Sequence, residues 1–298
     1  MERRDFLKTM GLSTVSIAVG NQLLSASTTK PAEALPSFGL ISGSNGSWHP
    51  DGALEGLKKI AEWGYTELEG GLPRGMETAD FLALLKPLGL KTIIGSCDMA
   101  SVIDAEKIKA SIERAHLLGQ QFMVCYWPWI GENQGSHIDD WKQVANNLNK
   151  GADICKKEGI TLLYHNHDLE FYPVEGQMPF DVLMAMLDPS ICIELDLYWI
   201  TKSGQSPIAY IEKYPDRYPV FHVKDMPVDV KCGQGLTDFS KLTESDFAPI
   251  GSGCVDFPGI FKLNRTAGAK HFIVESDKPG DMATFLELSA KYLREITF

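Results

Sequence analysis

The chain has 298 residues, of which 44% are hydrophobic and 22% are charged, with a formal net charge of −11 and a pI of about 5.1. This composition is typical of a soluble globular protein, and the length suffices for one large domain or two ordinary ones. The negative charge repels phosphate backbones and argues against nucleic acid as a partner.

The N-terminal segment resembles a twin-arginine export signal. Arg3 and Arg4 precede a mild apolar stretch, Met10–Leu24, which small residues follow. The stretch is too short and too interrupted by Gly and Ser to span a membrane, and it lacks a cysteine for a lipid anchor, so no membrane anchor is expected. An ordinary amphipathic helix is the alternative. We expect a leader over residues 1–35, a periplasmic location, and one domain over residues 36–298.

Short apolar runs alternate with amphipathic segments through the rest of the chain. The apolar runs predict eight strands: Phe38–Ser42, Tyr65–Glu69, Thr92–Cys97, Phe122–Trp127, Thr161–His165, Ile191–Asp196, Val220–Val223 and Phe272–Glu275. The segments between them predict eight helices: Asp51–Trp63, Thr78–Leu88, Asp104–Leu118, Asp139–Glu158, Phe180–Leu187, Ile208–Tyr214, Phe257–Ala267 and Met282–Ile296. Gly64, Gly89 and Gly119 follow three of these helices, where a left-handed residue ends a helix.

The strict alternation of strands and helices predicts a parallel sheet. Eight such units over about 260 residues fit a closed (β/α)8 TIM barrel, which typically needs ~250 residues. A doubly wound open sheet is the alternative. It is less favoured because "GSNGSW", after the first strand, lacks the GxGxxG spacing of a dinucleotide site.

The ends of four successive strands predict a metal site. Function in a TIM barrel lies at the carboxyl ends of the strands. The fifth to eighth strands end in His165, Asp196, His222 and Glu275. Mixed imidazole and carboxylate ligands suit Mn, Co, Zn or Fe, whereas Mg prefers ligands that are all oxygen. Mg is the remaining alternative. The alternative is that each is a structural polar group, with Asp196 capping the next turn and Glu275 pairing with a lysine.

Several motifs resemble one known family. "ELDLYWITKSG", "YPDRYPVFHVKDM", "IGSGCVDFPGIF" and "FIVESD" resemble the sugar phosphate isomerase/epimerase family of xylose-isomerase-like barrels. "GYTELEG" is similar to its second-strand segment, and "YHNHDLEF" to the fifth-strand segment of an inosose-dehydratase-like branch. The resemblance runs from about Phe38 to the C-terminus and is most specific over residues 194–225. It implies a (β/α)8 barrel, a divalent metal, and polyol or sugar substrates.

The resemblance also implies roles for individual residues. It places Asp196, His222 and Glu275 on metal-ligand positions, Glu69 on an acidic substrate-contacting position, and Trp199 and Lys224 beside the metal. At the fifth strand, ketose epimerases usually present a glutamate that binds metal and moves a proton. This chain has His165 and His167 there, with Glu170 further on. The position of the family glutamate favours His165 as the ligand and leaves His167 to face substrate, which argues against a symmetric two-glutamate proton transfer.

These parts suit proton abstraction next to a carbonyl, with a divalent metal stabilising the resulting enediolate. The acid/base candidates are Glu275, His167 and Lys224. Lys224 has two alternatives, neutralising an enolate oxygen or forming a salt bridge with Asp225 or Glu170. The substrate-contact candidates are Glu69, Glu170, Trp127 and Trp199, with the tryptophans stacking on a sugar face or simply packing in the core.

The sequence therefore predicts a metal-dependent sugar isomerase or epimerase. A lyase or dehydratase acting on a keto-sugar or 3-keto-glycoside is the alternative, and export favours it slightly because phosphorylated metabolites are rare outside the cytoplasm. A non-catalytic sugar-binding protein is a further alternative, and the charge of −11 argues against an apurinic-site endonuclease. A homo-oligomer is left open. Cys232 and Cys254 form a candidate disulfide in an oxidising compartment.

Overall fold

The computed structural model describes residues 33–298 apart from residues 42–48, 50, 74 and 130–134. Most of the expected leader, residues 1–32, lies outside the described residues, so its prediction stays a prediction. Within the described residues, none of the helices has the length and apolar character needed to cross a membrane. Cys232 and Cys254 are both exposed and free, so the candidate disulfide is not formed in this structure.

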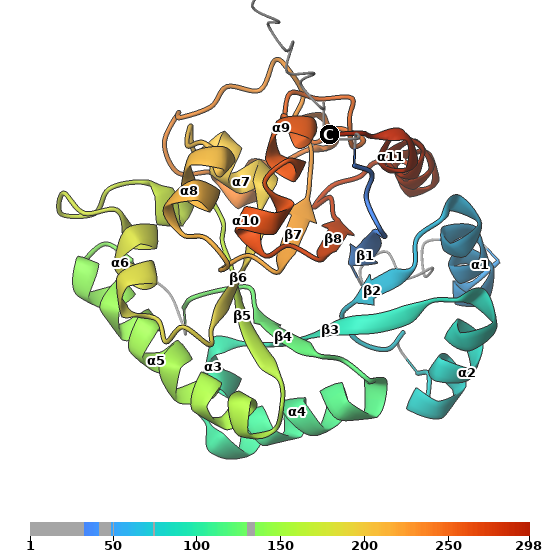
Figure 1. Cartoon of the computed structure of the whole chain (residues 1–298), viewed down its shortest axis with the longest axis horizontal. Helices are drawn as coiled ribbons and strands as arrows, with labels where there is room; N and C mark the ends of the chain where they lie inside the picture. Colours follow the sequence, from blue (N-terminus) through green and yellow to red (C-terminus); the bar gives the residue numbers. More distant parts are fainter. Residues whose placement is uncertain (1–32, 42–48, 50, 74, 130–134) are drawn as a thin grey trace, which may run out of the picture. The chain divides into compact units, whose positions relative to one another are not determined.

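Eight parallel strands form one closed barrel, as predicted. They are β1 (Gly39–Ile41), β2 (Glu67–Glu69), β3 (Lys91–Cys97), β4 (Phe122–Cys125), β5 (Thr161–His165), β6 (Cys192–Asp196), β7 (Val220–Val223) and β8 (His271–Val274). Each strand pairs with its neighbours in sequence, and β8 closes the barrel against β1. Figure 1 shows this closure as the red end of the chain lying beside the blue end.

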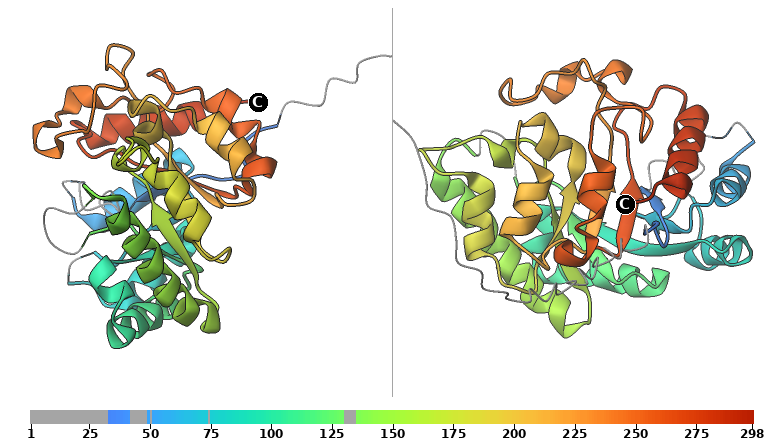
Figure 2. Two further views of the ribbon diagram at one scale, coloured as in Figure 1. Left: turned by 90° about the vertical axis from the view of Figure 1, so that its left-hand side faces the viewer. Right: turned by 45° about the horizontal axis from the view of Figure 1, so that its top comes forward.

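Helices follow the strands and pack around the barrel (Figures 1 and 2). They are α1 (Ala53–Trp63), α2 (Thr78–Leu88), α3 (Met99–Val102), α4 (Ala105–Leu118), α5 (Ile138–Lys157), α6 (Pro179–Met186), α7 (Leu197–Lys202), α8 (Pro207–Lys213), α9 (Phe257–Phe261), α10 (Asn264–Ala267) and α11 (Met282–Glu295). Gly64, Gly89 and Gly119 adopt the left-handed conformation after α1, α2 and α4, as predicted.

The helix predictions were wrong in two respects. The predicted helix Phe257–Ala267 is two short helices, α9 and α10, because the chain leaves the helical hydrogen-bond pattern at Lys262 and Leu263. The helices α3 and α7, which directly follow β3 and β6, were not predicted. Both begin at an aspartate, Asp98 or Asp196, whose side chain accepts a backbone N–H of the first turn.

The barrel interior is arranged in layers. Its apolar layer consists of Ile94, Val124, Leu163, Val220 and Ile273, which belong to one cluster with Ile93 on the other face of β3. Side chains two residues apart on a strand share a face, so each residue two positions beyond this layer also points inward. On β5, β7 and just after β8 these residues are His165, His222 and Glu275. An apolar layer therefore supports a polar layer at the carboxyl end of the barrel.

Asp225, which follows β7, anchors the chain ahead of α9. It is buried, and its carboxylate accepts four backbone N–H groups, those of Met226, Gly251, Gly253 and Val255, at 2.8–3.2 Å. Buried donors of this kind are costly to leave unpaired. The carboxylate therefore fixes the segment 249–255 against the end of β7.

We expect Asp225→Ala to lower the free energy of unfolding by about 3 kcal/mol, because it leaves several buried N–H groups without an acceptor. Urea denaturation followed by circular dichroism measures this change. Asp229→Ala, which removes an exposed aspartate four residues further on, is the matched control and should leave stability nearly unchanged. Equal effects of the two substitutions would contradict the anchoring role.

Candidate metal centre

The strand register brings the four predicted metal ligands together. Asp196 and His222 are paired partners on β6 and β7, and His165 of β5 is level with Glu194 of β6. One ligand atom from each of His165, Asp196, His222 and Glu275 lies within 4.8 Å of the others. The four residues chosen from the strand ends thus form one cluster at the carboxyl end of the barrel.

The ligand atoms point towards a common position. His165 Nε2 lies 3.9 Å from Asp196 Oδ2. His222 Nδ1 lies 4.0 Å from the same oxygen and 2.9 Å from Glu275 Oε2. Atoms bound tetrahedrally at ~2.1 Å from one ion are roughly 3.4 Å apart, so these separations bracket the spacing that a small divalent cation needs.

Asp196 uses its two oxygens differently. Oδ1 accepts the backbone N–H of Trp199 at 2.7 Å and so caps α7, as the structural alternative predicted. Oδ2 is buried and makes no hydrogen bond, although Lys224 Nζ is 3.2 Å away. A buried carboxylate oxygen without a hydrogen bond, aimed at two imidazoles and a second carboxylate, fits a bound cation.

Lys224 is fully buried beside the ligand set. Its Nζ lies 2.7 Å from Glu275, 2.9 Å from Asp277 and 3.2 Å from Asp196. The predicted alternative, a salt bridge with Asp225 or Glu170, is therefore wrong, because both of those carboxylates are occupied by other groups. Burial alone would lower the pKa of Lys224, but the surrounding carboxylates raise it well above its usual value, so Lys224 is charged.

Negative charge nevertheless predominates. Glu69, Glu194, Asp196 and Glu275 are clustered carboxylates, and three of them are fully buried. Burial, helped by nearby carboxylates, raises the pKa of Glu194 to about 8 and that of Asp196 to about 6. A divalent cation would offset this excess of negative charge and favour the ionised carboxylates.

Glu194 holds both ligand histidines and was not predicted as a site residue. Its Oε2 lies 3.1 Å from His165 Nδ1 and 3.2 Å from His222 Nε2. These nitrogens face away from the ligand cluster. With a cation on the opposite nitrogens, His165 would donate its Nδ1–H to Glu194 and His222 would donate its Nε2–H to Glu69, beside Glu194, so the two rings would be held as different tautomers. Glu194 shares its inward face with Asp196, two residues on, and this alternation was the signal available in the sequence.

Glu69 lies behind His222. Its Oε2 is 3.0 Å from His222 Nε2, and its other oxygen accepts the hydroxyl of Tyr126. Glu69 is buried, with 1% of its surface exposed. Its contacts within the protein thus orient an imidazole, and its predicted contact with substrate stays a prediction.

His167 presents an unpaired nitrogen next to the ligand set. Its Nδ1 is buried without a hydrogen bond, and its ring centroid is 4.8 Å from that of His165. Burial and the charge of Lys224 lower the pKa of His167 to about 3, so the ring is neutral. Glu170 is buried and accepts the backbone N–H of His167 at 2.9 Å and the hydroxyl of Tyr164. Glu170 therefore fixes the backbone that carries His167.

The two predicted tryptophans differ in exposure. Trp199 is fully buried, with its ring 5.8 Å from that of His167, whereas Trp127 is 40% exposed, with its ring 5.1 Å from His167. Trp127 is thus the one open to a ligand from solvent, and Trp199 forms the floor beneath His167.

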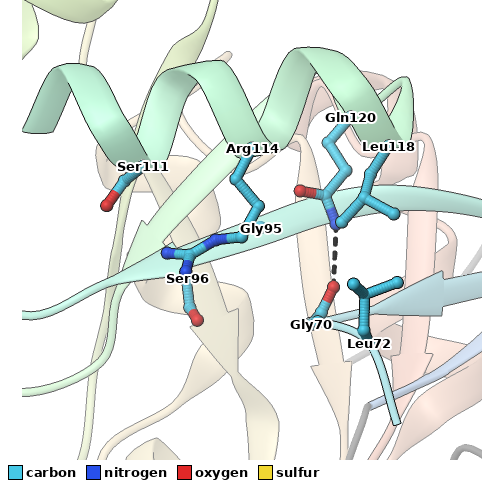
Figure 3. Close-up of a pocket in the computed structure, with 9 residues that line it drawn as sticks. Gly70, Leu72, Gly95, Ser96, Ser111, Arg114, Leu118 and Gln120 are labelled. Atoms are coloured by element: carbon cyan, nitrogen blue, oxygen red, sulfur yellow. Dashed lines mark hydrogen bonds between the residues drawn. The ribbon is translucent and has the colours of Figure 1, made fainter. Parts of the chain in front are cut away.

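A separate cavity of about 360 Å³ lies between α4 and the ends of β2 and β3 (Figure 3). Ser96, Ser111 and Arg114 line it, and Gln120 Nε2 donates to the carbonyl of Gly70 at 2.8 Å at its edge. None of the residues predicted from the sequence to form the site lines this cavity.

Comparison with known proteins supports the same fold. A family model described as the xylose isomerase-like TIM barrel matches residues 57–296. An inosose dehydratase from Clostridium beijerinckii is 32% identical over 167 residues, which cover 53% of this chain and 55% of that protein. The chain thus spans about half the length of the curated relatives it matches.

Solved structures are similar over most of the described chain. A sugar phosphate isomerase/epimerase from Parabacteroides distasonis has a TM-score of 0.70 and 27% identity, covering 89% of this chain and 96% of that one. A structure of the IolI protein with a bound zinc atom has a TM-score of 0.64 at 14% identity, covering 86% and 95%. At 14% identity, the similarity to the IolI structure is one of fold alone.

We expect Glu194→Gln to weaken cobalt or zinc binding by about 10- to 100-fold, because a neutral amide lacks the negative charge that strengthens the contacts with both histidines. Isothermal titration of the metal-stripped protein measures the affinity, and Asp196→Ala, which removes a ligand, sets the limit of full loss. Glu67→Gln alters another buried barrel glutamate, one that contacts His271 rather than the ligand histidines, and serves as the matched control. Unchanged affinity in Glu194→Gln would contradict the role of its carboxylate.

Proposed function

Because the chain belongs to the xylose isomerase-like TIM barrel family, we propose that it is a divalent-metal-dependent lyase acting on a keto-sugar or keto-glycoside. The reaction removes a proton from the carbon next to a carbonyl, forms a carbon–carbon double bond, and breaks the carbon–oxygen bond on the following carbon. The leaving oxygen takes up a proton, so the step is balanced and needs no oxidant or reductant.

One observation carries the choice of elimination. The two groups of the site that are placed to act on substrate are chemically different: Glu275, the carboxylate of the ligand set that follows β8, and His167, a neutral imidazole after β5. Moving a proton between two faces or two carbons is served best by matched groups, as in a two-carboxylate pair. Elimination instead needs a base at one carbon and a hydrogen-bonding group at the departing oxygen.

Glu275 is suited to remove the proton. Its side chain is 16% exposed, whereas those of His165, Asp196 and His222 are at most 3% exposed, so it is the ligand residue that substrate reaches. Burial would raise its pKa, but Lys224 and His222 lower the pKa well below its usual value. Glu275 is therefore ionised at neutral pH and can accept a proton, as a weak base that depends on activation of the substrate carbonyl by the metal.

Lys224 and His167 support the two ends of the reaction. The charged Nζ of Lys224 lies 2.7 Å from Glu275. It would stabilise the negative charge that develops on the substrate when the proton leaves. The neutral ring of His167 has one nitrogen that donates and one that accepts, so it hydrogen-bonds the departing oxygen without adding charge. A divalent cation held by His165, Asp196, His222 and Glu275 would polarise the carbonyl of the substrate.

The relatives support a lyase in this family. Several inosose dehydratases match about half of the chain. The P. distasonis structure described as a sugar phosphate isomerase/epimerase favours isomerisation as the second candidate. In both reactions the first step is removal of a proton next to a carbonyl, and they differ in the fate of the electron pair.

Incubation with 3-keto-glucosides and cyclic keto-polyols in D₂O, followed by NMR, distinguishes these functions. We expect release of the leaving group and an unsaturated ketone, loss of turnover with EDTA, and recovery with manganese or cobalt. Deuterium uptake without release of the leaving group would favour isomerisation. Absence of both deuterium uptake and release in the metal-loaded protein would favour a binding protein.

Glu275→Gln should reduce turnover by about 10²- to 10⁴-fold, because it removes the base. Turnover is measured at full metal occupancy, and Glu287→Gln, which changes an exposed glutamate, is the control.

We also propose that residues 1–35 are a twin-arginine leader and that the mature protein is periplasmic. Replacing Arg3 and Arg4 together by lysine should keep the protein in the cytoplasm, because the arginine pair carries this signal. Fractionation of cells that express the full chain measures the location. Lys8→Arg is the control, and export of the double variant would contradict the proposal.

A further inference from the structure

A groove of about 390 Å³ lies beside the metal centre. Side chains from three segments line it, those after β4, after β5 and between β7 and β8, including Trp127, Trp129, Tyr172, Leu236, Thr237 and Phe239. The segment between β7 and α9, drawn in orange, extends beyond the strand ends in Figure 2. The volume is in the range of small-molecule sites, ~300–1,000 Å³.

The groove adjoins the reacting end of the site. The ring centroid of Trp127 is 5.1 Å from that of His167 and 5.8 Å from that of Phe239, and His167 and Phe239 are 5.6 Å apart. His167 in turn is 4.8 Å from His165. A substituent on a ring held at the metal centre therefore enters the groove past His167.

The walls are mainly apolar and open to solvent at one side. Trp127 is 40% exposed and Leu236 is 66% exposed, two of the large hydrophobic side chains that the described fold leaves uncovered. Among the described residues that line the groove, none is a lysine or an arginine and Asp168 is the one charged residue. A phosphate or carboxylate on the ligand would meet a carboxylate and no cation here, so the groove suits a neutral group.

Two buried oxygens in the lining lack partners. Asp168 is fully buried, and its Oδ2 accepts the backbone N–H of Thr237 at 2.8 Å, but its Oδ1 makes no hydrogen bond. The hydroxyl of Thr237 lies beside this carboxylate and makes no well-aligned hydrogen bond. Buried polar atoms in proteins are normally paired, so these two oxygens suit a hydroxyl group of a ligand.

We propose that this groove binds a hydroxylated aromatic ring attached to the sugar, which is the leaving group of the reaction. The part of the proposal that names it a leaving group rests on the proposed function, whereas binding of the ring does not. Aromatic and aliphatic walls with two buried, unpaired oxygens on one side fit a flat apolar ring that carries a hydroxyl. A second sugar ring would bring several hydroxyls against walls that are mainly apolar.

Isothermal titration with unoxidised glucosides tests the groove separately from catalysis. The metal-loaded protein is titrated with 4-hydroxyphenyl, phenyl and methyl β-glucosides and with cellobiose, which lack the keto group that elimination requires. We expect the 4-hydroxyphenyl glucoside to bind at least tenfold more tightly than the methyl glucoside. Equal affinities of these two, or tighter binding of cellobiose, would overturn the proposal.

Two variants locate the binding. Leu236→Lys should weaken binding of the hydroxyphenyl glucoside about tenfold, whereas Leu117→Lys, at an equally exposed leucine on α4, should not change it. Thr237→Val keeps the size of the side chain and the backbone contact with Asp168, and should abolish the preference for the hydroxyphenyl over the phenyl glucoside. If Leu236→Lys and Leu117→Lys behave alike, the ring does not bind in this groove.

The outcomes also separate this proposal from the proposed function. Binding that depends on Leu236, without release from any 3-keto-glucoside, would support the groove and contradict the lyase. Elimination from methyl and hydroxyphenyl keto-glucosides with the same kcat/KM, and no effect of Leu236→Lys on either, would support the lyase and overturn the groove.

Discussion

Mutual repulsion among buried carboxylates is the constraint on which this site depends. The barrel brings Glu69 of β2 and both Glu194 and Asp196 of β6 into its interior, with Glu275, just after β8, at their edge. Carboxylates placed so close together in a poorly solvated interior are unstable unless protons, hydrogen bonds or cations compensate them. The remaining residues of the cluster are best understood as that compensation.

The compensation is divided between two sides of His222. On the inner side, Tyr126 donates to Glu69, and Nε2 of the imidazole lies between Glu69 and Glu194. On the outer side, Lys224 pairs with Asp196 and Glu275, and Nδ1 of the imidazole faces the same two carboxylates. Both oxygens of Glu69 thus have hydrogen bonds, whereas Glu194 Oε1 and Asp196 Oδ2 have none, and Asp196 Oδ2 is the oxygen that faces the ligand set. One imidazole separates the supporting residues from the reactive ones.

Much of the ligand set could be predicted because a parallel barrel makes strand ends equivalent. Once the alternation of strands and helices is recognised, His165, Asp196, His222 and Glu275 must lie at one end of the barrel, whatever the details of packing. Glu194 was missed because only the last residue of each strand was considered, although alternation places it on the same inward face. The predicted contact of Glu170 with substrate stays a prediction, and its contacts with Tyr164 and the backbone of His167 depend on a short turn whose geometry local sequence does not determine.

The groove could not be predicted for a different reason. Phe239 and Thr237 belong to a long connection between β7 and α9 that has neither strand nor helix periodicity, so nothing in the sequence indicates which strand end it covers. Its position is set by tertiary contacts, such as that between Thr237 and Asp168, which join residues 69 positions apart. The role of Leu236 could not be predicted either, because its exposed side chain lines the groove only once the fold places it on the same groove as Trp127.

The placement of the groove and of Glu275 gives the proposed reaction a direction. Glu275 follows β8, whereas Trp127 and His167 follow β4 and β5, so the base and the groove approach the ligand set from different sides. In the proposed reaction, a keto-sugar held between them would have its reactive carbon–hydrogen bond towards the carboxylate and its leaving group towards the imidazole and the aromatic walls. Binding energy from a ring in the groove would then hold the breaking carbon–oxygen bond next to His167, where it contributes to the rate and not only to affinity.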